Sequence, residues 1–485
     1  AGEDIVEYAG EGTDAIELIT STNFTSTQTP DTFIDNIEEL RFGGANLTAT
    51  FTGVELNAKT IVLTETVSGT SNLIINIFNG DTNSFTGITA STFTSGSDII
   101  TINGETGNET ITGPNVASTI LAGTGDDIIS GGSTADTIDG GDGADSLTGG
   151  SGNDVYLFDT GDVDSGESIT EASSGGTDTV AIVTTTDFAN MPVASFNEIE
   201  EIRFAGANQT GTFTGAQLTG ETLSLTETAS GTSNLIINVA SGTTATFANI
   251  TASTFTSGSD TITINGTTGN ETITGPNLAS TINAGTGDDN ITGGSASDII
   301  TGGDGADTID GGGGTDTVTG GGSADIINLG SGDGVSDTLV FSGINNTDNG
   351  DIISNFVAGS SGDIIDFTTN IAQVGTNDPT TTFDSDTTID DTTAFIVSGS
   401  NVSQGSSATL TEALTGISVG TFDDGGGTND KIYIGWDNGS HTYIGLITSD
   451  GNNDGFTGDT LTLICTLSGL SDCTTLTSSN FLDFS

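Results

Sequence analysis

The sequence predicts an all-β protein built as tandem solenoids of short β-coils. Three observations support this prediction: a long internal duplication, a large apolar residue at every ninth position inside each copy, and glycine-rich segments between these positions. Apolar residues make up 32% of the 485 residues, and there are 73 glycines. The composition is therefore that of a folded chain and not of an acidic disordered tail.

The chain contains two copies of one unit. Residues 37–150 recur at 199–312 with a constant shift of 162, so IEELRFGGANLTATFTG reappears as IEEIRFAGANQTGTFTG. The duplication predicts three domains: a first β unit over 1–160, a second copy over 161–330, and a different β-rich C-terminal domain over 331–485.

A finer repeat places one large apolar residue at every ninth position. A helix would require apolar spacings of three and four, whereas this step, within short Ile- and Thr-rich segments, favours strands and turns stacked as a solenoid. Strand-like runs over 1–95 and 165–257 fit either further coils or a small β-sandwich beside each solenoid. The repeated positions are Ile102, Ile111, Ile120, Ile129, Ile138, Leu147 and Tyr156 in the first copy, and Ile264, Ile273, Ile282, Ile291, Ile300, Ile309, Val318 and Ile327 in the second.

The nonapeptides follow the pattern G-G-x-G-x-D-x-U-x, in which U is a large apolar residue. The match is complete at 140–148, 149–157, 302–310 and 311–319, and it has one departure each at 122–130, 131–139, 284–292, 293–301 and 320–328. The aspartate offers the hard carboxylate oxygen that Ca²⁺ prefers, and glycine lets the turn adopt a positive φ. The candidate metal-site residues are Asp127, Asp136, Asp145, Asp154, Asp289, Asp298, Asp307, Asp316, Asp325, Gly125, Gly143, Gly152, Gly287, Gly305 and Gly314.

These nonapeptides resemble the repeats of the RTX family of secreted calcium-binding proteins. The resemblance implies tandem parallel β-roll or β-helix solenoids, with additional β-coil or β-sandwich segments and a β-rich C-terminal domain. It also implies Ca²⁺ as cofactor, held between turns that lie 18 residues apart. Coils with Glu109, Ser118, Glu271 or Ser280 at the aspartate position are expected to bind no metal. The implied pairs are Asp127 with Asp145, Asp136 with Asp154, Asp289 with Asp307, Asp298 with Asp316, and Asp307 with Asp325.

The charge balance excludes several functions. Four Lys and Arg stand against 66 Asp and Glu, which gives a net charge of −62. Nucleic-acid binding and adsorption to anionic lipid both need a basic surface, which this chain lacks. No apolar run is long enough for a membrane-spanning helix. Self-repulsion of this size disfavours a compact bare chain, so we expect cations to neutralise it.

The C-terminal region suggests an exported protein. Residues 441–485 resemble the end of RTX proteins that carries an uncleaved type I secretion signal, which implies a secreted, surface-associated protein of a Gram-negative type of bacterium. Cys465 and Cys473 then predict a disulfide, with two free thiols as the alternative. The loop 449–461 is either a further ion site, through Asp450, Asn452 and Asp454, or a plain polar hairpin.

No catalytic constellation is apparent. His441 is the one histidine, and neither an H-E-x-x-H nor a G-x-S-x-G motif is present. We therefore expect no enzyme. The repeats and composition resemble those of RTX-type bacterial S-layer proteins, so the favoured function is a calcium-dependent structural protein that self-assembles into a surface layer or an extracellular filament. The alternatives are a repeat region of an RTX adhesin, which could contact a cell-surface polysaccharide, and a carrier domain cleaved from a secreted hydrolase.

Overall fold

The chain is described by a computed structural model. It describes residues 13–25, 36–93, 97–173, 175–255, 259–330, 334–341, 350–359, 362–367, 395–397, 431–437, 440–448, 460–470, 476 and 481–482. Two compact units are formed, residues 1–236 with 251–260, and residues 237–250 with 261–485. The domain boundaries predicted from the duplication, after 160 and after 330, stay a prediction.

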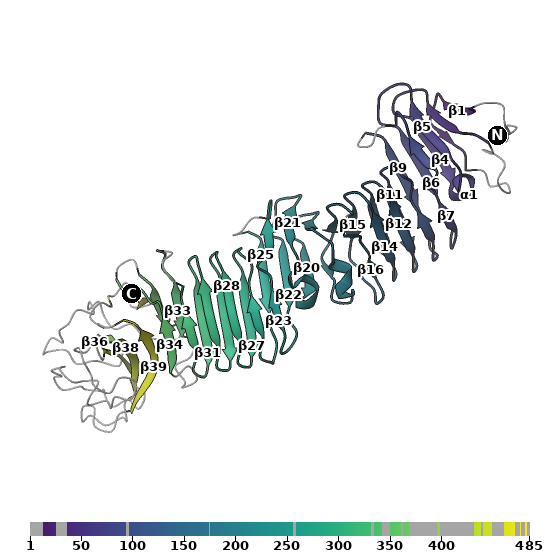
Figure 1. The fold of residues 1–485 in the computed structure, drawn as a ribbon. Coiled ribbons are helices and arrows are strands. Elements are labelled where there is room, and N and C mark those ends of the chain that lie inside the picture. The colour runs from purple at the N-terminus through teal and green to yellow at the C-terminus, as the bar shows by residue number, and fades with distance from the viewer. Residues whose placement is uncertain are drawn as a thin grey trace. The chain divides into compact units, whose positions relative to one another are not determined.

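The first unit is a parallel β-solenoid, and Figure 1 shows its strands stacked side by side. One sheet orders β1 (Ala15–Leu18), β3 (Glu39–Phe42), β5 (Ile61–Glu65) and β8 (Ile88–Ala90). A second orders β16 (Ser168–Ile169), β14 (Ser146–Gly150), β12 (Ile128–Gly132), β10 (Thr110–Thr112) and β7 (Thr82–Ser84). A third runs through β2 (Thr22–Asn23), β4 (Thr48–Thr52), β6 (Asn72–Asn76), β9 (Ile99–Asn103), β11 (Thr119–Thr124), β13 (Thr137–Asp142), β15 (Val155–Phe158), β17 (Thr179–Ile182), β19 (Glu201–Phe204) and β21 (Leu223–Glu227). β18 (Thr186–Asp187) pairs in parallel with β20 (Thr210–Thr214).

The second unit repeats this architecture and ends in antiparallel strands. One sheet continues through β25 (Thr261–Asn265), β27 (Thr281–Thr286), β29 (Ile299–Asp304), β31 (Thr317–Gly322), β33 (Thr338–Phe341), β35 (Ile364–Phe367) and β40 (Phe481–Leu482). The other orders β23 (Thr244–Thr246), β26 (Thr272–Thr274), β28 (Asn290–Gly294), β30 (Thr308–Gly312), β32 (Ile326–Asn328), β34 (Asp351–Ser354), β39 (Thr460–Ser468), β38 (His441–Thr448), β37 (Lys431–Asp437) and β36 (Phe395–Val397). Within it, β37, β38 and β39 pair antiparallel. β22 (Asn234–Asn238) and β24 (Ile250–Ala252) lie where the two units divide the chain.

The nine-residue step sets the register of both rolls. Nine residues carry the chain from one sheet to the other, and 18 residues bring it back, so Ile120 pairs with Ile138 on one sheet and Ile129 with Leu147 on the other. Side chains alternate between the two faces of a strand. The repeated apolar residues therefore all point between the sheets, where they are buried. The prediction of an all-β solenoid of parallel coils is confirmed.

The segments left open by the sequence are further parallel coils. In the first unit β6 pairs with β9 and β9 with β11, so the described coils of 13–25 and 36–93 continue into the roll. The coils outside the rolls contain more residues than those of the rolls. Some of the extra residues form the short helices α1 (Gly53–Leu56) and α2 (Gly215–Leu218) and the 3₁₀ turn η1 (Val193–Phe196). The N-terminus of α1 is capped by Glu55, which accepts a hydrogen bond from the Thr52 amide at 2.8 Å. No helix among the described residues is long and apolar enough to cross a membrane.

Two predictions about the C-terminal region fall partly outside the described residues. Cys465 is buried on β39, and Cys473 lies outside the described residues, so the disulfide stays a prediction. Asp450, Asn452 and Asp454 also lie outside them.

Candidate metal centre

Glycine is required at the turns because the backbone there has a positive φ. The predicted glycines have φ of 132° at Gly125, 145° at Gly143, 130° at Gly152, 128° at Gly287, 143° at Gly305 and 104° at Gly314. Space also forbids a side chain: a Cβ at Gly305 would lie 2.0 Å from the carbonyl oxygen of Gly287 on the preceding turn of the same side. The turns therefore stack with backbone carbonyl oxygens close beneath them.

The structure brings together all five predicted aspartate pairs. In each pair the backbone N–H of the earlier aspartate donates to Oδ1 of the aspartate 18 residues later. We call these successive contacts the aspartate ladder. The N–O distances are 2.7 Å for Asp127 to Asp145, 2.7 Å for Asp136 to Asp154, 2.8 Å for Asp289 to Asp307, 2.9 Å for Asp298 to Asp316, and 2.8 Å for Asp307 to Asp325.

The second carboxylate oxygen, Oδ2, of ladder aspartates such as Asp145 and Asp307 points toward a glycine that lies five residues earlier in the chain. Oδ2 of Asp145 lies 2.2 Å from the place that a Cβ on Gly140 would fill, and Asp307 stands in the same relation to Gly302 at 2.3 Å. A buried carboxylate oxygen without a partner carries a large desolvation cost. Among the described residues, the Oδ2 atoms that are buried without a hydrogen-bond partner include those of Asp127, Asp136, Asp145, Asp154, Asp289, Asp298 and Asp307.

Burial makes the negative charge of these carboxylates unfavourable. Mainly because of desolvation, the pKa values of Asp127 and Asp136 rise to about 7. Desolvation likewise raises the pKa values of Asp145, Asp154, Asp298 and Asp307 to about 6. A cation placed against Oδ2 would reverse this cost, because an opposite charge nearby favours the ionised form.

The ladder extends beyond the nonapeptides in both directions, through residues that sequence reasoning missed. Upstream, the Glu109 amide donates to Asp127, and Glu109 itself accepts from the Gly80 amide, at 2.6 and 2.7 Å. Glu109 is buried and its Oε2 has no hydrogen-bond partner, and the expectation that its coil binds no metal stays a prediction. Downstream acceptors are Glu167 for Asp145, Asp178 for Asp154, Glu200 for Asp178, Asp337 for Asp316, Asp351 for Asp325 and Asp363 for Asp337.

A local signal could have found most of these downstream residues. Glu167, Asp178, Asp337, Asp351 and Asp363 each stand two residues before a buried apolar residue of a strand, as in D-x-U of the nonapeptide. None has the complete glycine pattern of the nonapeptide, although Gly176 precedes Asp178 by two residues, and they lie 21 to 26 residues after their partners instead of 18. A search for the nine-residue step therefore passes over them.

The donor set suits Ca²⁺. It consists of carboxylate and backbone carbonyl oxygens, the mixed shell of six to eight oxygens that Ca²⁺ accepts. Zinc sites use histidine and cysteine ligands, and neither residue occurs in the ladder. The residues present therefore fit the ion that the repeats imply, with Oδ2 of the aspartates and the carbonyl oxygens of the stacked glycine turns as the atoms that would hold it.

Comparison with known proteins gives the same assignment. The model of the RTX calcium-binding nonapeptide repeat matches residues 119–156, 265–300, 279–309 and 301–335. No curated protein matches the chain. The matched residues contain all nine predicted aspartates. The chain therefore carries RTX calcium-binding nonapeptide repeats, and Ca²⁺ is the cofactor of these repeats.

Proposed function

We propose that the chain is a secreted, calcium-dependent structural protein that assembles with copies of itself into a surface layer or an extracellular filament. The aspartate ladder carries this proposal. It runs through both rolls, so Ca²⁺ acts on the framework of the molecule and not at one local site. A framework that binds Ca²⁺ only when folded is stabilised where Ca²⁺ is abundant, as it is outside the cell. Such a protein is compatible with export through a type I secretion system of a Gram-negative bacterium.

The outer faces of the sheets support self-association. Isoleucines are exposed on them, among them Ile326 at 53% and Ile352 at 47%, which are neighbours on the paired strands β32 and β34. The net charge of −62 makes bare copies repel one another. Divalent cations between acidic faces would remove that repulsion and let apolar patches meet. A contact between unlike faces of two copies produces open fibres or lattices.

The environment of the histidine favours a structural role over catalysis. His441 lies on β38, and its Nδ1 accepts a hydrogen bond from the Gly469 amide at 3.1 Å. Its ring packs edge-on against Tyr443, with centroids 6.5 Å apart. An imidazole held in this way links the first residue of β38 to the residue after β39. We therefore propose that the chain is not an enzyme and that its main partner is a second copy of itself.

The test compares the whole chain in EGTA, in millimolar Mg²⁺ and in millimolar Ca²⁺. Circular dichroism measures the β content and negative-stain electron microscopy records any assembly. We expect β structure and ordered sheets or filaments with Ca²⁺, and neither with Mg²⁺, because Mg²⁺ demands a smaller octahedral shell.

Two outcomes would overturn parts of the proposal. Single elongated particles in Ca²⁺ would exclude self-assembly and would favour an adhesin region, with a surface polysaccharide as ligand, or a carrier domain. A chain that is already folded in EGTA would exclude calcium as the condition for folding.

A further inference from the structure

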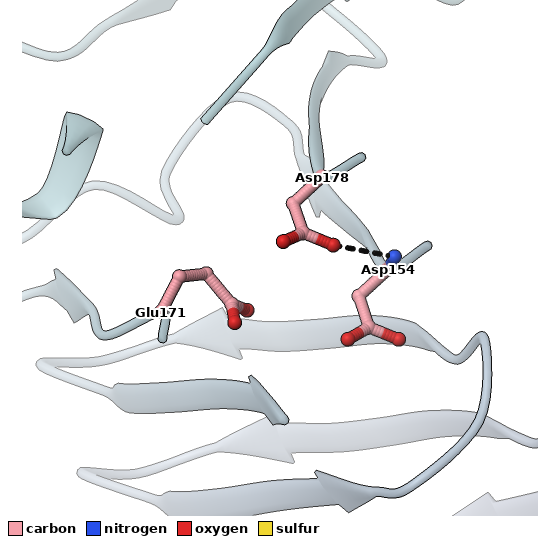
Figure 2. Close-up of side chains that lie close together, drawn as sticks. All are labelled: Asp154, Glu171 and Asp178. Atoms are coloured by element: carbon pink, nitrogen blue, oxygen red, sulfur yellow. Dashed lines mark hydrogen bonds between the residues drawn. The ribbon is translucent and has the colours of Figure 1, made fainter. Parts of the chain in front are cut away.

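Three carboxylates converge where the first roll ends. Asp154 is the last aspartate of the first set of nonapeptides, whereas Glu171 and Asp178 come from the segment that follows it, around β16 and before β17. Figure 2 shows the three side chains pointing toward one another. One oxygen from each lies within 4.8 Å of the others. Two of these three residues lie outside the matched residues 119–156.

The hydrogen bonds around the trio use one oxygen of each carboxylate. Asp154 Oδ1 accepts from the Asp136 amide at 2.7 Å, and Asp178 Oδ1 accepts from the Asp154 amide at 2.8 Å. Glu171 Oε1 accepts from the Gly149 amide at 3.0 Å and from the hydroxyl of Tyr156. These bonds fix the direction of all three carboxylates.

The remaining oxygens point to a missing ligand. Asp154 is 0% exposed, and its Oδ2 has no hydrogen-bond partner. Oε2 of Glu171 is also buried without one. The place that a Cβ on Gly149 would fill is bordered by Asp154 Oδ2 at 2.3 Å and by Glu171 Oε1 at 2.6 Å. The geometry thus contains a buried, unpartnered carboxylate oxygen aimed at a second carboxylate.

We propose that Asp154, Glu171 and Asp178 form a further Ca²⁺ site that joins the first roll to the segment after it. Ca²⁺–oxygen distances are about 2.3–2.6 Å, so two ligands of one ion lie up to about 5.2 Å apart. The separation of 4.8 Å lies within this limit. Among the described residues no second group of three acidic side chains lies this close together.

Backbone oxygens complete the mixed shell that Ca²⁺ accepts. The carbonyl oxygens of Gly150 and Ala172 each lie 3.1 Å from the place that a Cβ on Gly175 would fill, and Asp178 Oδ2 lies 3.3 Å from it. Glycine at 175 therefore leaves room beside three oxygens. The site differs from the nonapeptide sites because a glutamate and an aspartate after the repeat replace the aspartate of a following turn. Binding here orders the chain from the roll to β17, where the coils of the second copy begin.

Tyr156 provides a specific probe, because its hydroxyl donates to Glu171. Tb³⁺ prefers the same oxygen ligands as Ca²⁺ and emits when a tyrosine beside it is excited. The experiment titrates the whole chain with Tb³⁺ under tyrosine excitation, and measures bound Ca²⁺ per chain by equilibrium dialysis. We expect Glu171→Gln to bind one ion fewer per chain and to lose the emission that passes through Tyr156. Glu105→Gln, an exposed carboxylate in the same unit, is the matched control and should leave both readouts unchanged.

A second variant keeps the test decisive if Glu171→Gln does not fold. Tyr156→Phe keeps the buried ring, and it should retain the Ca²⁺ count while losing the same part of the emission. Equal emission from the wild type and Tyr156→Phe would refute the site, and so would an unchanged Ca²⁺ count in folded Glu171→Gln. Neither readout depends on assembly, so failure of the self-assembly proposal would leave this result standing.

Discussion

Replacing Asp307 by asparagine should change stability in opposite directions with and without Ca²⁺. Asp307 belongs to two predicted pairs, because its Oδ1 accepts from the Asp289 amide and its own amide donates to Asp325. Asparagine retains an oxygen for the first hydrogen bond and removes the charge. The variant therefore separates the role of the carboxylate in cation binding from its role in the backbone network.

The two magnitudes follow from linkage. At a free Ca²⁺ concentration 100 times Kd, one site stabilises the folded state by about 2.7 kcal/mol, so loss of two sites lowers the free energy of unfolding by about 5 kcal/mol. Without Ca²⁺ the carboxylate of wild-type Asp307 destabilises the folded roll at neutral pH, since burial raises its pKa to about 6. At about 1.4 kcal/mol per pKa unit, discounted for screening, removing this charge should stabilise the metal-free roll by about 1–2 kcal/mol at neutral pH.

The assay is urea unfolding followed by circular dichroism, in EGTA and in saturating Ca²⁺. The matched control is Asp288→Asn, which removes the same charge from an exposed side chain that accepts from the Ala306 amide. Asn270 makes the same contact one coil earlier, with the Asp288 amide, so asparagine is compatible with this position. A variant Asp307→Asn that loses equal stability in EGTA and in Ca²⁺ would refute the reasoning, because the carboxylate would then act only through the backbone network.

Four further predictions follow from the same geometry. Asp145→Ala should weaken Ca²⁺ binding in the first roll and leave the second roll intact, as measured by Ca²⁺ titration; full affinity would refute the pairing with Asp127. Gly305→Ala should destabilise its roll by about 3 kcal/mol, since φ is 143° and the new Cβ meets backbone, whereas Gly313→Ala meets no atom closer than 3.8 Å and should be near neutral in urea unfolding. Ile309→Ala should cost about 2–5 kcal/mol in the same assay while keeping the Ca²⁺ count at saturation. In EGTA, lowering the pH from 7.5 to 5 should increase the β content measured by circular dichroism. Carboxyl groups whose pKa is raised in the folded state bind more protons folded than unfolded, so they destabilise the fold increasingly as the pH rises from about 4 to about 7. With Ca²⁺ bound, the same acidification should release ions and destabilise the rolls.

The nine-residue step predicted the core of the rolls because the geometry of the coil sets both the spacing of the apolar residues and their inward direction. A residue that recurs at every ninth position must face inward on every coil, so Ile120 and Ile138 stack in register and are buried. The same step correctly placed the aspartates 18 residues apart, directly before neighbouring strands of one sheet. Sequence periodicity is informative here because a solenoid contacts mainly its own next coil.

The coils outside the nonapeptides were less predictable because their length varies. Ala49 pairs with Leu73, whereas Leu73 pairs with Ile100, so no single period describes this part of the chain. Insertions such as α1 are accommodated at the turns while the strands keep their parallel pairing. For the same reason the ladder residues Glu167 and Asp178 escaped detection. Their chemistry is that of the repeat, but their spacing is not.

The ladder explains why this chain needs cations from solution. Neighbouring parallel strands lie about 4.8 Å apart, and two unit charges at that distance repel by about 3–4 kcal/mol at an effective dielectric constant of about 20. One backbone hydrogen bond to a carboxylate returns about 1.5–3 kcal/mol, and an interior aspartate has a charged neighbour on both sides. The two arginines do not make up the difference, because Arg41 and Arg203 contact Glu39 and Glu201, which lie outside the ladder. Because each added nonapeptide of the rolls adds at least one carboxylate and no basic residue, a longer roll needs more Ca²⁺, and we expect the folded length to depend on the Ca²⁺ concentration.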